Sequence, residues 1–156
     1  MVKQECTYHS NYELASLKEY YNNVLILEEN YNNKGQRHGV YREWHNNAVL
    51  KKETIYHNGN INGFARMWFE NGVLSYEQYY ENNNKSGTCR LWYENGVLEC
   101  EGIYKDGKLN GIYRRWYPDG TLRYEHQYKN NKVNGIQKEW DKNGFLLYER
   151  SYSPPL

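Results

Sequence analysis

Tryptophan recurs at a fixed step of 24 residues along this chain of 156 residues. All five Trp residues share that step, and four further columns keep the same phase. A period of this length over five copies indicates a tandem repeat protein, in which each repeat is stabilised mainly by its neighbours. The columns are Trp44, Trp68, Trp92, Trp116 and Trp140; Gly39, Gly63, Gly87, Gly111 and Gly135; Leu50, Leu74, Leu98, Leu122 and Leu146; Glu53, Glu77, Glu101, Glu125 and Glu149; Tyr56, Tyr80, Tyr104, Tyr128 and Tyr152.

Each repeat also carries two turn signals. Asn95-Gly96 and Asp106-Gly107 are dipeptides favoured by type I′ turns, because both central residues need a positive φ. The segments between turns have seven to nine residues and are rich in Tyr, Trp, Leu and Ile, which suits strands. The sequence therefore predicts an all-β fold: tandem 24-residue β-hairpin repeats forming one extended, twisted antiparallel meander sheet.

The columns also define the domain organisation. Full repeats start at residues 39, 63, 87, 111 and 135, and residues 19–38 read as a half-repeat with Glu19 in the Trp column and an insertion in the turn at 33–36. The repeat sheet is thus expected over 19–152, between an N-terminal cap (1–18) and a tail (153–156) whose two Pro residues should end the sheet. Within the cap, Ser10-Asn11-Tyr12-Glu13 has the form of a capping box and predicts a short helix over 11–19; an irregular strand is the alternative.

A two-residue turn at Asn95-Gly96 would sort the side chains onto two faces. It pairs Arg90 with Glu101, Leu91 with Cys100, Trp92 with Glu99 and Tyr93 with Leu98. We call one face the tyrosine face (Tyr93, Leu98, Cys100, Tyr104, Leu109, Gly111) and the other the charged face (Thr88, Arg90, Trp92, Glu101, Ile103). Basic and acidic columns then become cross-strand partners, so exchanging Arg90 and Glu101 should be nearly neutral for stability.

The Gly column falls in the middle of strands on the tyrosine face. Glycine inside a strand often marks close approach by a large group. We expect a Tyr ring from the next strand to pack over each of these glycines, which is a structural role.

Composition argues against several function classes. The 20 basic and 19 acidic residues nearly cancel, so the long-range field of a nucleic-acid binder is missing. Five scattered His residues and three Cys residues show no metal-ligand spacing, each column Glu has a basic partner, and no nucleophile or phosphate-loop motif occurs. These features predict no catalytic residue, no metal and no cofactor. The odd Cys count and the start without an apolar signal core favour a cytoplasmic protein, and the Asn, Lys and Tyr bias suits a low-GC bacterium or a large DNA virus.

Residues 106–122, Asp-Gly-Lys-Leu-Asn-Gly-Ile-Tyr-Arg-Arg-Trp-Tyr-Pro-Asp-Gly-Thr-Leu, closely resemble the MORN-repeat variant of bacterial YwqK-like antitoxin-repeat proteins, with similar arrays in large DNA viruses. The resemblance covers residues 19–152 and departs from the pattern at Glu19, Ala48 and the inserted turn. It implies an extended antiparallel sheet acting as an interaction scaffold, neutralisation of a partner toxin in some members, and membrane-associated assembly in others. It supplies no catalytic residue.

The leading hypothesis is a non-enzymatic module that binds another protein through a Tyr-rich surface, because Tyr offers a large contact area at low entropy cost. The same rings must also pack the sheet, so a purely structural role is the alternative reading of each. An antitoxin-like or host-factor-blocking inhibitor and a phospholipid-binding scaffold are the alternative functions, and pairing of two copies through the last strand, at about 145–152, would give a homodimer, in the host cytoplasm if the protein is viral. The candidate binding residues are Tyr56, Tyr80, Tyr93, Tyr104, Tyr113, Tyr117 and Tyr128.

Overall fold

Thirteen antiparallel strands make up the fold. The computed structural model describes residues 1–152, and these residues contain no helix. Hydrogen-bonded neighbours follow chain order from β1 to β13 in an open meander sheet, as the repeat pattern predicts. The strands are β1 (Val2–Tyr8), β2 (Leu14–Tyr21), β3 (Val24–Asn30), β4 (Gly39–Trp44), β5 (Leu50–His57), β6 (Asn60–Trp68), β7 (Leu74–Glu81), β8 (Asn84–Trp92), β9 (Leu98–Lys105), β10 (Lys108–Trp116), β11 (Leu122–Lys129), β12 (Lys132–Trp140) and β13 (Leu146–Tyr152).

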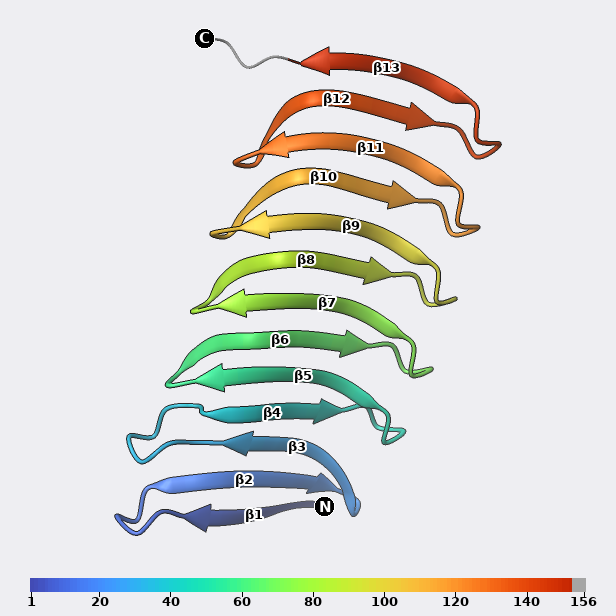
Figure 1. Cartoon of the computed structure of the whole chain (residues 1–156). Helices are drawn as coiled ribbons and strands as arrows, with labels where there is room; N and C mark the ends of the chain where they lie inside the picture. Colours follow the sequence, from blue (N-terminus) through green and yellow to red (C-terminus); the bar gives the residue numbers. More distant parts are fainter. Residues whose placement is uncertain (153–156) are drawn as a thin grey trace. The chain divides into compact units, whose positions relative to one another are not determined.

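Contacts divide the chain into two compact units. Unit 1 comprises Met1–Leu74 with Tyr80–Asn83, and unit 2 comprises Ser75–Tyr79 with the chain from Asn84 onward. In unit 2, the β8–β9, β10–β11 and β12–β13 turns lie along one rim of the sheet, and the β9–β10 and β11–β12 turns lie along the other (Figure 1).

The predicted helix over 11–19 is wrong, and its strand alternative is what the chain adopts. The capping-box residues form a turn instead, in which the Tyr12 N–H donates to the His9 carbonyl (3.0 Å) and the His9 N–H donates to the Glu13 carbonyl (2.8 Å). Leu14–Tyr21 then pairs with β1 on one side and β3 on the other. An isolated helix this short is marginal in water, whereas the two ladders satisfy the backbone on both sides of β2.

This first hairpin follows the repeat pattern with a shifted phase. His9 corresponds to His45, because both open the same kind of turn and place the ring Nε2 2.9 Å from a carbonyl of a following strand, that of Tyr31 or Trp68. The two-residue turn at Asn22-Asn23 likewise corresponds to Asn58-Gly59. Both correspondences span 36 residues (45 − 9 and 58 − 22), which is one and a half repeats. The Trp column therefore falls on Tyr8 in this hairpin rather than on Glu19.

The two turns of a repeat differ in type. Asp106-Gly107 is a type I′ turn as predicted, with φ of 51° and 75°, and the same holds at Asn58-Gly59, Asn82-Asn83 and Asn130-Asn131. Type I′ is wrong for Asn95-Gly96, since only Gly96 has a positive φ (85°). There the Gly96 N–H donates to the Tyr93 carbonyl (2.9 Å) and the Tyr93 N–H to the Val97 carbonyl (2.8 Å), which defines a three-residue loop. Such a loop is a type I turn closed by a glycine in the left-handed region.

The longer loop changes part of the predicted register. Arg90 faces Glu101 and Leu91 faces Cys100 as expected, but the register shifts beside Trp92, which faces Leu98 instead of Glu99. Directly opposed residues share a face, so Leu98 lies on the charged face and Tyr93 belongs to the loop. The remaining predicted members of the tyrosine face, Cys100, Tyr104, Leu109 and Gly111, keep their place.

The prediction that a Tyr ring packs over each glycine of the Gly column is also wrong. These glycines have φ between 69° and 128°, so the backbone conformation itself excludes other residues. The atoms nearest to a Cβ on Gly63 or Gly111 would belong to an Ile side chain and not to a Tyr ring. Close approach of a ring occurs elsewhere, at the buried Gly102, where a Cβ would lie 2.7 Å from Tyr113 Cδ2.

Candidate protein-binding face

The charged face holds a row of alternating charges that stabilises each unit. In unit 1 it runs through Lys18, Glu28, Arg42, Glu53 and Arg66, with adjacent side chains 2.9–4.0 Å apart. In unit 2 it runs through Glu77, Arg90, Glu101, Arg114, Glu125, Lys138 and Glu149, one residue from each of β7 to β13. The predicted Arg90–Glu101 pair is confirmed, with Nε 2.7 Å from Oε2. Because every cation has acidic neighbours, this face is nearly neutral and offers no basic patch.

The tyrosine face of unit 2 carries an aromatic cluster on β10 and β11. The rings of Tyr113 and Tyr124 stack with centroids 5.8 Å apart, and His126 stacks on Tyr124 at 4.6 Å. Tyr128 meets Tyr113 edge-on at 6.2 Å. These geometries are the favourable offset and edge-to-face arrangements of aromatic pairs. We call these four residues the aromatic cluster; all are half-buried.

Burial perturbs the titratable groups around this cluster. Desolvation raises the pKa of Tyr113 well above its usual value, with a hydrogen bond to Cys100 adding to the effect. Burial likewise raises the pKa of the Cys89 thiol to about 11, and it lowers the pKa of His126 despite the opposing charge of Glu139. Each neutral form is therefore favoured, and the buried thiols are poor nucleophiles at neutral pH. The His126 Nε2 atom is buried without a hydrogen-bond partner in the described chain.

The structure places the seven candidate tyrosines in different settings. Tyr113 and Tyr128 belong to the aromatic cluster. Tyr104 lies on the same face, opposite Gly87 and beneath the Lys85 ammonium, 4.8 Å from the ring centroid. Tyr56 and Tyr80 belong to unit 1, where Tyr56 meets Tyr41 edge-on and Tyr80 is half-buried near the end of β7.

Tyr93 and Tyr117 instead join successive repeats. The Tyr93 hydroxyl donates to the Trp116 carbonyl (2.8 Å), and the Tyr117 hydroxyl donates to the Trp140 carbonyl (3.2 Å). His45 makes the equivalent contact with the Trp68 carbonyl in unit 1. A side chain of the preceding repeat thus caps the carbonyl of Trp68, Trp116 and Trp140 at the end of each of these strands. Tyr93 and Tyr117 therefore have a structural role.

Unit 1 has its own cluster on the tyrosine face, centred on buried Tyr41. The Arg37 guanidinium lies over the Tyr41 ring (4.9 Å) and the Tyr56 ring (5.6 Å) while pairing with buried Glu29 (2.9 Å). The Tyr31 hydroxyl also donates to Glu29, and desolvation with this bond raises the pKa of Tyr31 to about 12. Sequence reasoning missed Tyr41, Tyr124 and His126, since the residues at their positions differ from repeat to repeat and give no periodic signal.

Residues 1–152 contain no group of three or more His, Cys, Asp or Glu side chains that could hold a metal ion, and Cys6, Cys89 and Cys100 are all free thiols. No helix long and apolar enough to span a membrane occurs in the same residues.

Hairpins that repeat every 24 residues, share cross-repeat caps and expose one aromatic face define a tandem β-hairpin repeat protein. The MORN repeat variant family model matches residues 61–82, 85–106 and 109–130, so these three consecutive segments are MORN-type repeats. The family is a non-enzymatic one, and its repeats are generally protein- or membrane-binding modules. No curated protein matches the chain in a sequence comparison.

Proposed function

We propose that this protein is a non-enzymatic cytoplasmic interaction module that binds a partner protein through the tyrosine face of unit 2. The observation that supports the proposal is the aromatic cluster, because its rings are fixed by mutual contacts yet stay half-exposed. Pre-positioned tyrosines lose little entropy on binding and supply both apolar area and a hydroxyl.

Tyr128 is the most informative residue in this face. Its ring packs edge-on to Tyr113, but its hydroxyl has no hydrogen-bond partner within residues 1–152. The Tyr93 hydroxyl, by contrast, is used inside the sheet. The pair Tyr128→Phe and Tyr93→Phe therefore separates binding from folding with the same chemical change.

Affinity capture from extracts of the source cell, followed by titration of the captured protein, tests the proposal. Tyr128→Phe should lower the affinity for that partner by roughly three- to tenfold, because one hydrogen bond is lost, and should leave Tm unchanged. Tyr93→Phe should lower Tm and leave the affinity unchanged. Equal affinities for wild-type protein and Tyr128→Phe, with Tyr128→Ala also binding normally, would contradict the assignment of this face.

Two narrower functions make predictions that separate experiments can test. An antitoxin-like or host-factor-blocking inhibitor would capture one protein at fixed stoichiometry and abolish its activity. A phospholipid-binding scaffold would float with anionic liposomes at low salt, and absence of flotation would exclude it.

A further inference from the structure

One rim of unit 2 carries lysine pairs that the folded chain leaves uncompensated. Lys105 faces Lys108 across the β9–β10 turn, and Lys129 faces Lys132 across the β11–β12 turn. Like charges directly opposite each other destabilise a sheet. All four side chains are exposed, and none lies within ion-pair distance of a carboxylate in residues 1–152. The equivalent pairs of unit 1, His57 with Asn60 and Tyr21 with Val24, carry no such repulsion.

Two adjacent hollows lie among these lysines. The first, of about 300 Å³, is lined by Lys105, Asp106, Lys108, Asn110, Lys129 and Asn130. The second, of about 320 Å³, is lined by Lys129, Asn130, Lys132, Val133 and Asn134. The side-chain amides of Asn130 and Asn134 have no hydrogen-bond partner in the described part of the chain, so they can donate together with the ammonium groups. Ammonium and amide donors around a small hollow are suited to an oxyanion, and the single carboxylate in the first hollow, that of Asp106, is outnumbered by three lysines.

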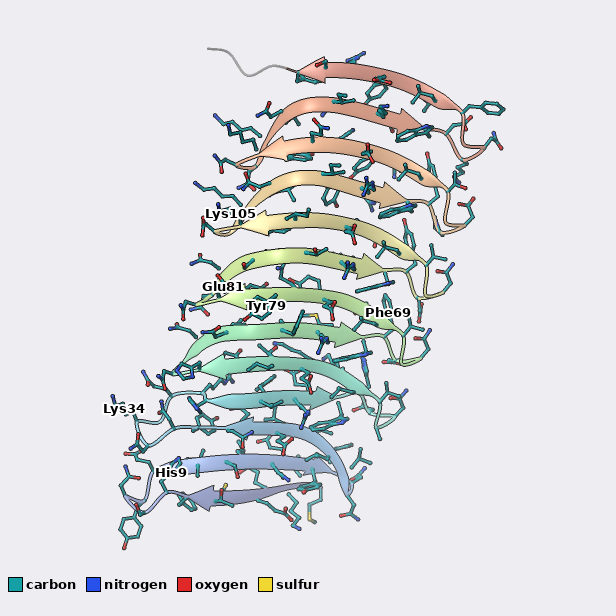
Figure 2. All side chains as sticks on the ribbon, viewed as in Figure 1. His9, Lys34, Phe69, Tyr79, Glu81 and Lys105 are labelled. Carbon is teal, nitrogen blue, oxygen red and sulfur yellow. The ribbon has the colours of Figure 1, made fainter. Side chains whose placement is uncertain are left out.

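We propose that this lysine rim (Lys105, Lys108, Lys129 and Lys132) binds an acidic, extended segment of the partner protein. The inference rests on the proposed function, because Tyr104 and Tyr128 immediately precede Lys105 and Lys129 and the rim therefore borders the tyrosine face; Figure 2 labels Lys105 at the turn end of β9. A partner bound to the tyrosine face can therefore contact the lysine rim at the same time, because the two surfaces adjoin.

The spacing of the two turns fits a peptide. They are two strand separations apart, which is roughly 9.6 Å. In a polyproline II segment, residues three apart lie on one side and are about 9.3 Å apart. Glutamates at positions i and i+3 of such a segment therefore match the two hollows. A bilayer presents a flat surface, whereas these lysines surround two small hollows in which Val133 is the only apolar lining residue.

The test uses the full-length protein and a synthetic peptide of four Glu-Pro-Pro repeats, with four Gln-Pro-Pro repeats as the matched control. The Glu peptide should bind, with an affinity that falls as salt rises, and the Gln peptide should not. Lys105→Gln with Lys129→Gln should weaken binding about tenfold, while Lys34→Gln with Lys51→Gln, the same charge change on unit 1, should leave it unchanged. Because the rim substitutions relieve repulsion, Tm should stay constant or rise, so a loss of binding cannot be ascribed to unfolding.

Three outcomes would overturn the inference: equal binding of the Glu and Gln peptides, equal loss in the two double variants, or tighter binding to phosphatidylserine vesicles than to the peptide with the same lysine dependence. Tyr128→Phe should not alter peptide binding. A normal peptide result together with a failed Tyr128 experiment would therefore reject the aromatic face and keep the rim.

Discussion

At the residue scale, the row at the centre of the tyrosine face has a different residue in every repeat. Its positions on the second strand of each hairpin are Thr54, Gln78, Gly102, His126 and Arg150. The side chains of this row have different surroundings: Gly102 admits the Tyr113 ring and His126 stacks on Tyr124, whereas Thr54 Oγ1 and Gln78 Oε1 are buried without a hydrogen-bond partner in the described residues. A repeat pattern identifies only the positions at which the repeats share a residue type. The sequence therefore could not predict that this row lies at the centre of the tyrosine face.

His126 makes a pH-dependent contribution to stability. Desolvation lowers its pKa in the folded state below the ordinary value of 6.5, so the unfolded chain binds more protons as the pH falls through that value. The folded state should therefore lose stability between pH 7.5 and 5.5. Urea denaturation should show this loss in wild-type protein and a smaller loss in His126→Gln. Parallel profiles for His126→Gln and wild type would contradict the prediction.

At the element scale, the sequence predicts a hairpin well where a turn needs particular residues. The two-residue turns require positive φ at both positions, which Asn, Asp and Gly supply, and these predictions are confirmed. Asn-Gly also suits a three-residue loop, so the dipeptide alone could not distinguish the two types at Asn95-Gly96. The first hairpin escaped detection because Tyr8 replaces the column Trp, and because Cys6 faces Leu17 where other repeats pair Arg or Lys with Glu.

The charge row corrects one expectation about those pairs. Arg90 contacts Glu101 at 2.7 Å and also Glu77 at 3.8 Å, while Glu101 faces Arg114 on the next strand. Exchanging Arg90 and Glu101 would therefore create a like-charge contact on each side. We now expect the exchange to destabilise unit 2 by about 1 kcal/mol rather than to be neutral.

A matched exchange provides the control. Lys138 and Glu149 end the row on β12 and β13, so exchanging them creates one like-charge contact, with Glu125, instead of two. Urea denaturation should give roughly half the cost for this exchange. Equal and negligible costs for both exchanges would show that the row consists of independent pairs.

At the scale of the whole molecule, the last strand of the sheet order is a candidate site of self-association. β13 pairs only with β12 among the described strands, and it exposes Leu146 (51%), Leu147 (60%) and Tyr152 (41%). An edge strand with exposed apolar side chains is a template for another strand, so homodimerisation through β13 remains a prediction. The charge row should weaken such a dimer, because symmetric antiparallel pairing centred on Glu149 would set two carboxylates directly opposite each other.

Sedimentation velocity over a range of concentrations checks this prediction. Wild-type protein should form a weak, concentration-dependent dimer, and Glu149→Gln should tighten it because the repulsion between the two carboxylates is removed. Leu147→Asp should weaken the dimer by adding charge to the exposed edge. Glu5→Gln makes the same change in the acidic residue of β1, which pairs with Lys18, and should leave the dimer unaffected. If Glu5→Gln and Glu149→Gln act alike, or if wild-type protein sediments as a monomer at every concentration, then the β13 edge is not where two copies meet.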